Sequence, residues 1–352
     1  MAQRVRVLVA DDSAYMRVIL KDMIDSEEGL TVVGVAKDGI ETVEKAKELR
    51  PDVVLLDIQM PRMDGLATLQ RIMKEAPARV VMLSAMDKVD DQLPLRALEM
   101  GAVDFISKPS GPVSVDIIKF RTRIGQILRD AAKARVTALK SVRTPHPRRL
   151  SLAPDHAPRR NGLKTILFGA STGGPRALES IFASLPRDLP AAMFVVQHLP
   201  AEFSKSFAKR LDAANGPEVR VAADGEEIRK GVCYLAPGGF HLEIDLNESH
   251  SYITRLTQDA PVNFVRPSAD VLLTSAARCC GSNSLAVILT GMGMDGTYGA
   301  MAIKSAGGRV VVQDEASSVI FGMAKSVIDS GAADRTLPLE DIPREIIRFL
   351  EG

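Results

Sequence analysis

Three residues in the second half of the chain have side chains that could together carry out acyl transfer: Ser171, His198 and Asp295. A serine hydroxyl is a poor nucleophile at neutral pH, so it needs an imidazole to take its proton. The imidazole in turn needs a carboxylate that fixes its tautomer and stabilises its charged form. Each residue follows an apolar run that we expect to be a strand, so the three side chains should meet at one edge of a sheet. The pattern predicts a serine nucleophile with its base and its orienting carboxylate.

The local sequence around Ser171 predicts a strand, a tight turn and a helix. The apolar run 165–168 ends at Gly169, and Gly173 follows the serine before a helical pattern begins. Free N–H groups at the start of that helix would face the serine, where they could stabilise an oxyanion. Gly169 to Gly173 also match the G-x-S-x-G pattern of hydrolases. This pattern is short, and an ordinary serine in a glycine-rich turn remains an alternative. The chain order Ser, His, Asp also differs from that of α/β-hydrolases, so that fold is not predicted.

Other residues offer competing interpretations of the second half. His241 is a rival base, and Asp295 could be a simple helix N-cap because it precedes a helical pattern. The glycines at 291, 293 and 296 spell G-x-G-x-x-G between an expected strand and an expected helix, and Asp314 ends the next strand. On spacing alone this is a dinucleotide fingerprint. It leaves Ser171 and His198 without a role.

A different set of polar residues ends the strands expected in the first 112 residues: Asp11, Asp12, Asp57, Ser84 and Lys108. Three carboxylates at one sheet edge repel one another unless a cation lies among them, and oxygen ligands of this charge suit Mg²⁺. A lysine and a hydroxyl at the same edge could hold a phosphoryl group on one of the carboxylates. The acidic residues could instead be helix N-caps, which would suit Asp12 but would not account for Lys108.

The elements that must position these residues alternate along most of the chain. Five apolar runs separated by helical patterns fill the first region, which predicts a doubly wound parallel sheet. The alternation resumes after residue 164 and predicts a second, mainly parallel α/β domain. Four short strands between 219 and 256 suggest a β-rich insertion in it.

The length of 352 residues suits two domains, and a change in composition separates them. We expect a first domain over residues 1–122, a connector over 123–163 and a second domain over 164–352. The connector begins with a helical extension. It continues as a segment rich in Pro and Arg, which predicts a flexible linker.

Composition narrows the class of protein. With 46% apolar and 25% charged residues the chain can bury two cores, and a net charge of +1 gives no general attraction to nucleic acid. The basic linker lacks interleaved aromatic residues, so we expect no nucleic-acid partner. The three cysteines form no C-x-x-C pair, which favours the reducing cytoplasm. No apolar run reaches membrane-spanning length and the N-terminus enters a strand almost at once, so we expect neither membrane insertion nor a signal peptide.

Residues 5–112 resemble the response-regulator receiver domains, which have a flavodoxin-like fold. The matching segments are Asp11 to Ser13, LDIQMPRMDG at Leu56 to Gly65, Ser84, and Lys108-Pro109. The resemblance implies that Asp57 accepts a phosphoryl group from a histidine kinase. It implies a switch hydroxyl at Ser84 and the family's ammonium group at Lys108. It also implies that Mg²⁺ is bound by three carboxylates and one main-chain carbonyl: Asp11, Asp12, Asp57 and Gln59.

Residues 165–347 resemble the catalytic domain of the chemotaxis protein-glutamate methylesterases. The segments that carry this resemblance are GASTGGP at 169–175, QHLP at 197–200, APGGFH at 236–241, VRPSADVL at 265–272, LTGMGMDG at 289–296 and QDEASSVIFGM at 313–323. The resemblance implies that Ser171 is the nucleophile, His198 the general base and acid, and Asp295 its orienting residue. The Met292 N–H would contribute to the oxyanion hole.

The substrate implied by this family is a glutamate methyl ester on the cytoplasmic helices of chemoreceptors, cleaved without a cofactor to release methanol. Many members also deamidate receptor glutamines. With a receiver in front, we expect an esterase that phosphorylation of Asp57 activates by freeing a covered Ser171 site. Two other hypotheses remain: a catalytically silent output domain that only binds receptors, and a dinucleotide-binding oxidoreductase.

Overall fold

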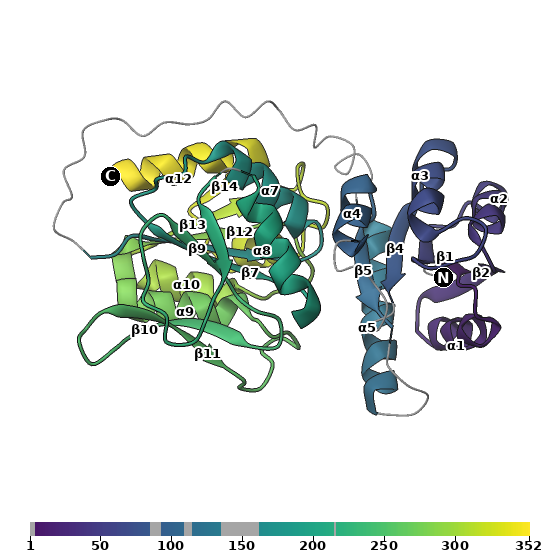
Figure 1. Ribbon diagram of the computed structural model, residues 1–352, viewed down its shortest axis with the longest axis horizontal. Helices are drawn as coiled ribbons and strands as arrows, with labels where there is room; N and C mark the ends of the chain where they lie inside the picture. The colour runs from purple at the N-terminus through teal and green to yellow at the C-terminus, as the bar shows by residue number, and fades with distance from the viewer. Residues whose placement is uncertain (1–3, 85–92, 109–114, 135–161, 215) are drawn as a thin grey trace. The chain divides into compact units, whose positions relative to one another are not determined.

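A computed structural model of the chain describes residues 4–84, 93–108, 115–134, 162–214 and 216–352 (Figure 1). The chain divides into two compact units, Met1–Ser141 and Val142–Gly352. Each unit is described by itself below. Pro109 of the receiver-like motif, and the Pro- and Arg-rich part of the expected linker from residue 135 to residue 161, lie outside the described residues.

The first unit contains a five-stranded parallel sheet in the order β2-β1-β3-β4-β5. Its strands are β1 (Val5–Ala10), β2 (Leu30–Ala36), β3 (Val53–Asp57), β4 (Arg79–Ser84) and β5 (Asp104–Ser107). Its helices are α1 (Ala14–Asp25), α2 (Gly39–Leu49), α3 (Gly65–Glu75), α4 (Leu93–Met100) and α5 (Val115–Lys133). This strand order is the flavodoxin-like arrangement that the sequence predicted. Helix α1 contacts α5, and helix α3 contacts both α2 and α4.

Local sequence explains where these helices begin. The side chains of Ser13, Asp38 and Asp64 accept hydrogen bonds from N–H groups in the first turns of α1, α2 and α3. The strands between them are apolar, and β3 is buried along its whole length. Buried parallel strands with capped helices on both sides leave the carboxyl ends of the strands as the edge where polar side chains can gather.

Helix α5 carries the first unit beyond the boundary expected at residue 122. The helix is continuous to Lys133, and Ile124, Leu128 and Ala131 on it are fully buried. The Arg79 side chain on β4 also donates a hydrogen bond to the main-chain oxygen of Ala134, at 3.0 Å. The helical extension therefore belongs to the first unit, because its apolar face packs on the sheet.

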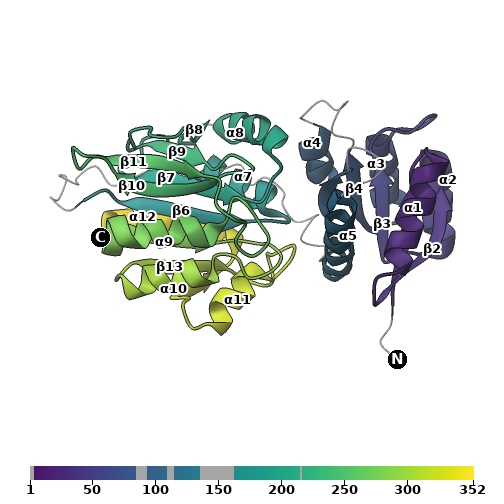
Figure 2. The same ribbon diagram turned by 90° about the horizontal axis from the view of Figure 1, so that it is seen from below.

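The second unit contains a seven-stranded parallel sheet in the order β14-β13-β12-β6-β7-β9-β8 (Figures 1 and 2). Its strands are β6 (Thr165–Ala170), β7 (Ala192–Gln197), β8 (Glu218–Val221), β9 (Val232–Leu235), β12 (Ser284–Ile288), β13 (Arg309–Gln313) and β14 (Arg335–Leu337). Its helices are α7 (Gly174–Ser184), α8 (Ser204–Asp212), α9 (Ala269–Cys280), α10 (Thr297–Ser305), α11 (Met323–Asp329) and α12 (Ile342–Glu351). Short 3₁₀ turns are η1 (Ala201–Phe203), η2 (Gly281–Asn283) and η3 (Leu339–Asp341).

The β-rich insertion is smaller than the sequence suggested. Strands β8 and β9 pair in parallel with each other, and β9 pairs with β7, so both extend the main sheet. A separate antiparallel hairpin is formed by β10 (His241–Leu246) and β11 (Tyr252–Thr257). The expectation differed because the sequence of a short strand does not specify which strand it pairs with. That choice depends on the edge that the rest of the fold presents.

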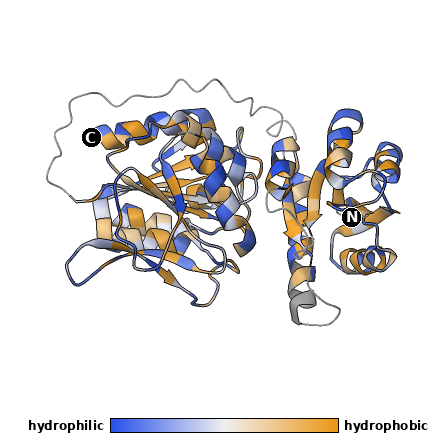
Figure 3. Ribbon diagram, viewed as in Figure 1, coloured by the Kyte–Doolittle hydropathy of each residue, from blue (hydrophilic) through white to orange (hydrophobic). Residues whose placement is uncertain are grey.

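Both faces of the second sheet are covered. One core contains apolar residues from α9, α10, α11 and the β10-β11 hairpin together with alternate residues of the sheet. On the opposite face, Phe168 of β6 packs against Phe182 of α7 with ring centroids 5.7 Å apart, and α7 contacts α8 and α12. Figure 3 shows the hydrophobic residues concentrated in the strands. Among the described residues, no helix combines the length and apolar character that crossing a bilayer requires.

Candidate active site

Ser171 lies in the turn between β6 and α7, at the carboxyl end of a central strand. Its N–H donates to the Thr290 carbonyl at 3.1 Å, and its own carbonyl accepts from the Gly174 N–H at 2.8 Å. Gly173, at φ +80°, is in the left-handed region and caps the helix without a side chain. The serine therefore lies directly before the N-terminus of α7, whose first N–H groups have no partner within the helix.

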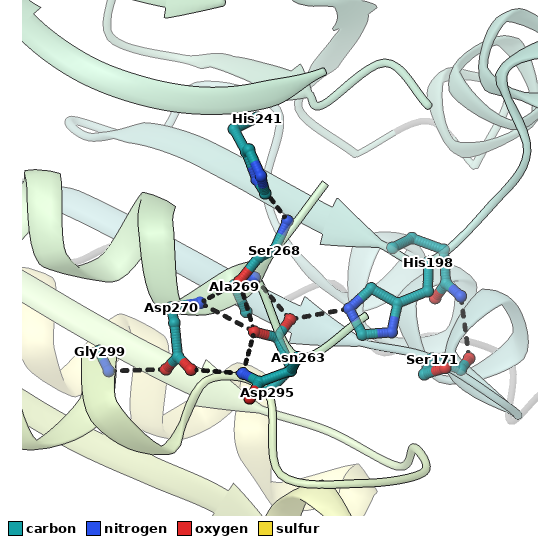
Figure 4. Close-up of polar contacts among 10 residues, drawn as sticks. Ser171, His198, His241, Asn263, Ser268, Ala269, Asp270, Asp295 and Gly299 are labelled. Atoms are coloured by element: carbon teal, nitrogen blue, oxygen red, sulfur yellow. Dashed lines mark hydrogen bonds and ion pairs between the residues drawn. The ribbon is translucent and has the colours of Figure 1, made fainter. Parts of the chain in front are cut away.

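His198 follows the neighbouring strand β7, and the pairing of β6 with β7 brings it beside Ser171. Ala170 pairs with Gln197, and the His198 N–H donates to the Ala170 carbonyl at 3.1 Å. The His198 Nε2 lies 2.8 Å from Oδ2 of Asp295 (Figure 4). A carboxylate only accepts hydrogen bonds, so Nε2 carries the proton and Nδ1 is left as the acceptor. This is the tautomer that a general base requires.

Asp295 is 2% exposed and lies at the N-terminus of α9, although it is distant from that helix in sequence. Its carboxylate accepts from the Ser268 hydroxyl at 2.5 Å, the Ala269 N–H at 2.7 Å and the Asp270 N–H at 3.2 Å. Burial alone would raise the pKa of Asp295. The hydrogen bond and positive charge of His198 favour the ionised form, and so do the hydrogen bonds from Ser268 and Ala269. Together they outweigh burial and lower this pKa below its usual value. The carboxylate is therefore held ionised beside the imidazole.

A second layer of polar residues supports this carboxylate, and the sequence did not predict it. The Asn263 side-chain amide donates to Asp270 at 2.8 Å and lies 3.4 Å from Oδ1 of Asp295. Asp270, itself 5% exposed, accepts from the Gly299 N–H at 2.7 Å. Burial raises the pKa of Asp270, and the nearby charge of Asp295 adds to the rise. The segment VRPSADVL marked this region of sequence, but it did not indicate which atoms would meet.

His241 has a structural role instead of facing Ser171. It is 1% exposed, its Nδ1 accepts from the Ser268 N–H at 3.2 Å, and its Nε2 lies 3.2 Å from the Ala260 carbonyl. Both ring nitrogens are thus engaged by the main chain. His241, which the sequence offered as an alternative base, therefore helps to hold the loop that carries Ser268.

The glycine-rich segment after β12 packs against the Ser171 turn. A Cβ at Gly291 would come within 2.8 Å of the Ser171 Cβ and 2.3 Å of the Met323 sulfur, so only glycine fits there. Gly296, at φ +91°, caps α10. The Asp314 carboxylate is occupied by the Ser317 N–H and hydroxyl, at 2.9 and 2.6 Å. Gly291, Gly296 and Asp314 therefore have local packing, capping and hydrogen-bonding roles.

Met292 follows Gly291 and so begins the loop next to Ser171. In the described part of the chain, no hydrogen-bond acceptor is found for the Met292 N–H. Between the described residues Ser171 and His198, the serine hydroxyl and Nδ1 form no direct hydrogen bond. Such bonds often form only once substrate is bound. The arrangement supplies a hydroxyl, an oriented imidazole, a fixed carboxylate and a candidate oxyanion donor.

A second polar cluster lies at the carboxyl edge of the first sheet. The Lys108 Nζ is 2.7 Å from Oδ2 of Asp11 and 2.8 Å from Oδ2 of Asp57, and Asp57 is 3% exposed. Burial raises the pKa of Asp57 to about 6, although Lys108 opposes the rise. Burial alone would lower the pKa of Lys108, but the two carboxylates outweigh it and raise that pKa. Ser84 is 2% exposed at the end of β4, where its carbonyl accepts from the Lys108 N–H at 2.7 Å.

The acidic residues of this cluster fit a divalent cation. Carboxylate oxygens of Asp11, Asp12 and Asp57 all lie within 4.8 Å of one another. Hard oxygen donors of this charge suit Mg²⁺. Gln59, whose carbonyl the sequence suggested as a further ligand, lies two residues beyond Asp57, and its N–H is 3.4 Å from Oδ1 of Asp57.

Comparisons with known proteins agree with both halves of the molecule. Residues 166–346 match the CheB methylesterase family, and residues 7–117 match the response regulator receiver domain. A Thermotoga maritima protein named protein-glutamate methylesterase/protein-glutamine glutaminase is 44% identical over 346 residues, covering 98% of each chain. A Thiobacillus denitrificans protein of the same name is 41% identical over 350 residues, covering 98% of this chain and 97% of that one.

A solved structure extends the similarity to the fold of the second unit. The crystal structure of the Thermotoga maritima CheB methylesterase catalytic domain is 45% identical, with a TM-score of 0.52. The similarity covers 53% of this chain and 98% of the Thermotoga maritima domain. The two resemblances stated from the sequence are thereby confirmed. The chain belongs to the CheB methylesterase family, with a response-regulator receiver domain preceding its catalytic domain.

Proposed function

We propose that this protein is a phosphorylation-activated response regulator that hydrolyses glutamate methyl esters on chemoreceptors. The observation that carries the proposal is the contact of 2.8 Å between His198 Nε2 and Asp295 Oδ2, one strand away from Ser171. Family membership and the names of the full-length relatives support the same activity, and those names also support glutamine deamidation.

The proposed chemistry begins at Ser171. Its Oγ attacks the ester carbonyl carbon while Nδ1 of His198 takes the hydroxyl proton, and Asp295 stabilises the imidazolium that forms. The developing oxyanion would be stabilised by the Met292 N–H. His198 returns the proton to the departing methoxide, which leaves as methanol. Water then attacks the acyl-enzyme by the same route and releases the glutamate. With a glutamine substrate the leaving group is ammonia.

Control by phosphorylation is proposed for the first unit. The Asp57 carboxylate would take a phosphoryl group from a phosphohistidine of the chemotaxis histidine kinase, leaving a neutral imidazole on the kinase. Bound at Asp11, Asp12 and Asp57, Mg²⁺ would offset the charge of the phosphoryl oxygens. Lys108 would form an ion pair with the phosphoryl group and Ser84 would donate a hydrogen bond to it. We further propose that the protein acts in the cytoplasm, and its three unpaired cysteines are compatible with that compartment.

The test is methanol release from membranes that contain methylated chemoreceptors. Wild type is compared with Ser171→Ala and Asp57→Asn, each with and without Mg²⁺ and a small phosphodonor. Ser184→Ala is a matched serine control, because Ser184 lies at the far end of α7 and donates only to the Ser180 carbonyl, at 3.1 Å. We expect release to require Ser171, to rise with phosphodonor in wild type, and not to rise in Asp57→Asn.

Each part of the proposal has its own contrary result. Undiminished release by Ser171→Ala would refute the nucleophile. Release that ignores the phosphodonor in wild type would refute control through Asp57 and leave the esterase intact. Receptor binding by wild type without any release would favour the catalytically silent output domain.

A further inference from the structure

Two buried polar side chains hold the main chain on either side of Ser171, and the proposed chemistry uses neither. Thr290 is 1% exposed and follows β12, the strand on one side of β6. Gln197 is 3% exposed and ends β7, the strand on the other side. Burying polar groups costs free energy unless they are hydrogen-bonded, so the hydrogen-bond partners of these two side chains indicate what they are buried to hold.

Thr290 holds the turn through both its main chain and its hydroxyl. Its carbonyl accepts the Ser171 N–H at 3.1 Å. Its hydroxyl proton has the Thr172 carbonyl at 2.9 Å as its nearer acceptor and the Ile320 carbonyl at 3.2 Å as a second one. The hydroxyl oxygen accepts from the Ile320 N–H at 3.0 Å. The peptide unit before Ser171 and the one after Thr172 are therefore both tied to one residue of the neighbouring strand end.

Gln197 holds the same turn from the opposite side. Its Nε2 donates to the Ser171 carbonyl at 2.9 Å, and no hydrogen bond within the described residues satisfies its Oε1. A Cβ at Gly174 would lie 2.1 Å from that oxygen, so the absence of a side chain at Gly174 gives the amide its room. The amide is thus kept in a place where its oxygen has no hydrogen-bond partner among the described residues.

Thr290 also connects the nucleophile to the loop of the candidate oxyanion donor. It precedes Gly291 and Met292, and the Gly291 N–H donates to the Ile320 carbonyl at 3.0 Å. The hydroxyl that fixes the Thr172 carbonyl therefore accepts from the same Ile320 that anchors Gly291. One buried side chain sets the spacing between the serine and the loop that begins at Met292.

We propose that Thr290 and Gln197 are positioning residues for acylation: they fix the main chain of the nucleophile turn so that the Ser171 hydroxyl faces His198 and the Met292 loop. The inference rests on the proposed function, since it requires Ser171 to be the nucleophile. Misplacing a reacting group by about 1 Å costs on the order of 100-fold in rate. Removing either hydrogen bond should therefore lower kcat, and it should leave KM nearly unchanged because both side chains are buried away from solvent.

The experiment uses the full chain and methanol release from methylated receptor membranes. Thr290→Val removes the hydroxyl at nearly constant volume, Thr290→Ser retains it, and Gln197→Met removes the amide. Thr165→Val is the matched control: Thr165 is fully buried at the amino end of β6, and its hydroxyl bonds Ser284 at 3.2 Å. Amide hydrogen exchange of β6 and β12 peptides reports whether each variant is folded.

We expect Thr290→Val and Gln197→Met to lower kcat by roughly 10- to 100-fold with KM within about threefold of wild type. Thr290→Ser and Thr165→Val should stay near the wild-type kcat. Folded Thr290→Val and Gln197→Met with wild-type kcat would overturn the inference. A loss in Thr290→Ser equal to that in Thr290→Val would also overturn it, because the methyl group would then be responsible. If Thr290→Val does not fold, Gln197→Met decides. Full activity of Ser171→Ala would refute the proposed function itself, which is a separate outcome.

Discussion

Replacing Asp57 by asparagine should stabilise the first unit, and the size of the effect depends on pH. The carboxyl has a pKa of about 6 in the folded unit, against an ordinary aspartate pKa of 3.8. A raised carboxyl pKa means that the folded state binds a proton more readily than the unfolded state, so stability falls as pH rises from about 4 to about 6. Above that window the ionised carboxylate costs about 3 kcal/mol, at about 1.4 kcal/mol for each pKa unit. Asparagine removes this cost, while Lys108 retains Asp11 at 2.7 Å.

The measurement is amide hydrogen exchange of β1 and β3 peptides in the full chain, without Mg²⁺. About 3 kcal/mol corresponds to exchange roughly 150-fold slower in Asp57→Asn than in wild type at pH 7.5. At pH 4 the two proteins should differ by less than about 1 kcal/mol, since the carboxyl is then largely protonated in the folded state. Asp22→Asn, at an exposed position of α1, controls for the loss of a charge.

Mg²⁺ gives a second check on the same reasoning. A cation among the carboxylates offsets their repulsion, so adding Mg²⁺ should slow exchange in wild type more than in Asp57→Asn. Equal exchange of the two proteins at pH 7.5 would refute the account of Asp57 as a strained, buried charge. A difference that is unchanged at pH 4 would show that another property of the substitution is responsible.

The catalytic unit yields three further predictions. Asp295→Asn should lower kcat by roughly 10³- to 10⁴-fold in the methanol assay, because an amide cannot hold the same tautomer of His198. The same change should destabilise the second unit above about pH 4, since a lowered carboxyl pKa contributes stability that is lost only as pH falls through it; urea unfolding at about pH 7 and again below about pH 3 measures this. Ser268→Ala removes a donor to Asp295 and should lower the free energy of unfolding by about 1 to 3 kcal/mol, measured by urea unfolding. An unchanged free energy of unfolding would show that this donor is dispensable. Gly291→Ala should lower kcat strongly, because a Cβ at 291 meets Ser171 and Met323. Gly293→Ala should lower it only mildly, because a Cβ at 293 meets nothing within 4 Å and the change adds only backbone strain at φ +77°. Equal effects would contradict this packing argument.

The sequence predicted the sheets and the residues at their carboxyl ends because both depend on local patterns. Apolar runs identify buried strands, and parallel strands bring Ser171 and His198 to one edge wherever the chain goes between them. The support around Asp295 could not be predicted in this way. Ser268 and Asn263 reach that carboxylate across 27 and 32 residues of sequence, and the contacts depend on how α9 is placed. The extent of the first unit was also hidden, because the boundary residue 122 lies within a helical pattern that does not change there.

The hydrogen bonds of Asp295 have a consequence for interpreting relatives of this protein. The carboxylate that orients His198 is also the group that accepts the first N–H groups of α9, so folding needs it whether or not the protein catalyses a reaction. A descendant that lost its esterase activity would still be under pressure to keep this aspartate. Retention of Asp295 is therefore weak evidence of activity in a relative. The side chains of Ser171 and His198 cap no helix in the described part of the chain. If they act as proposed, they are the positions where loss of activity would first be visible.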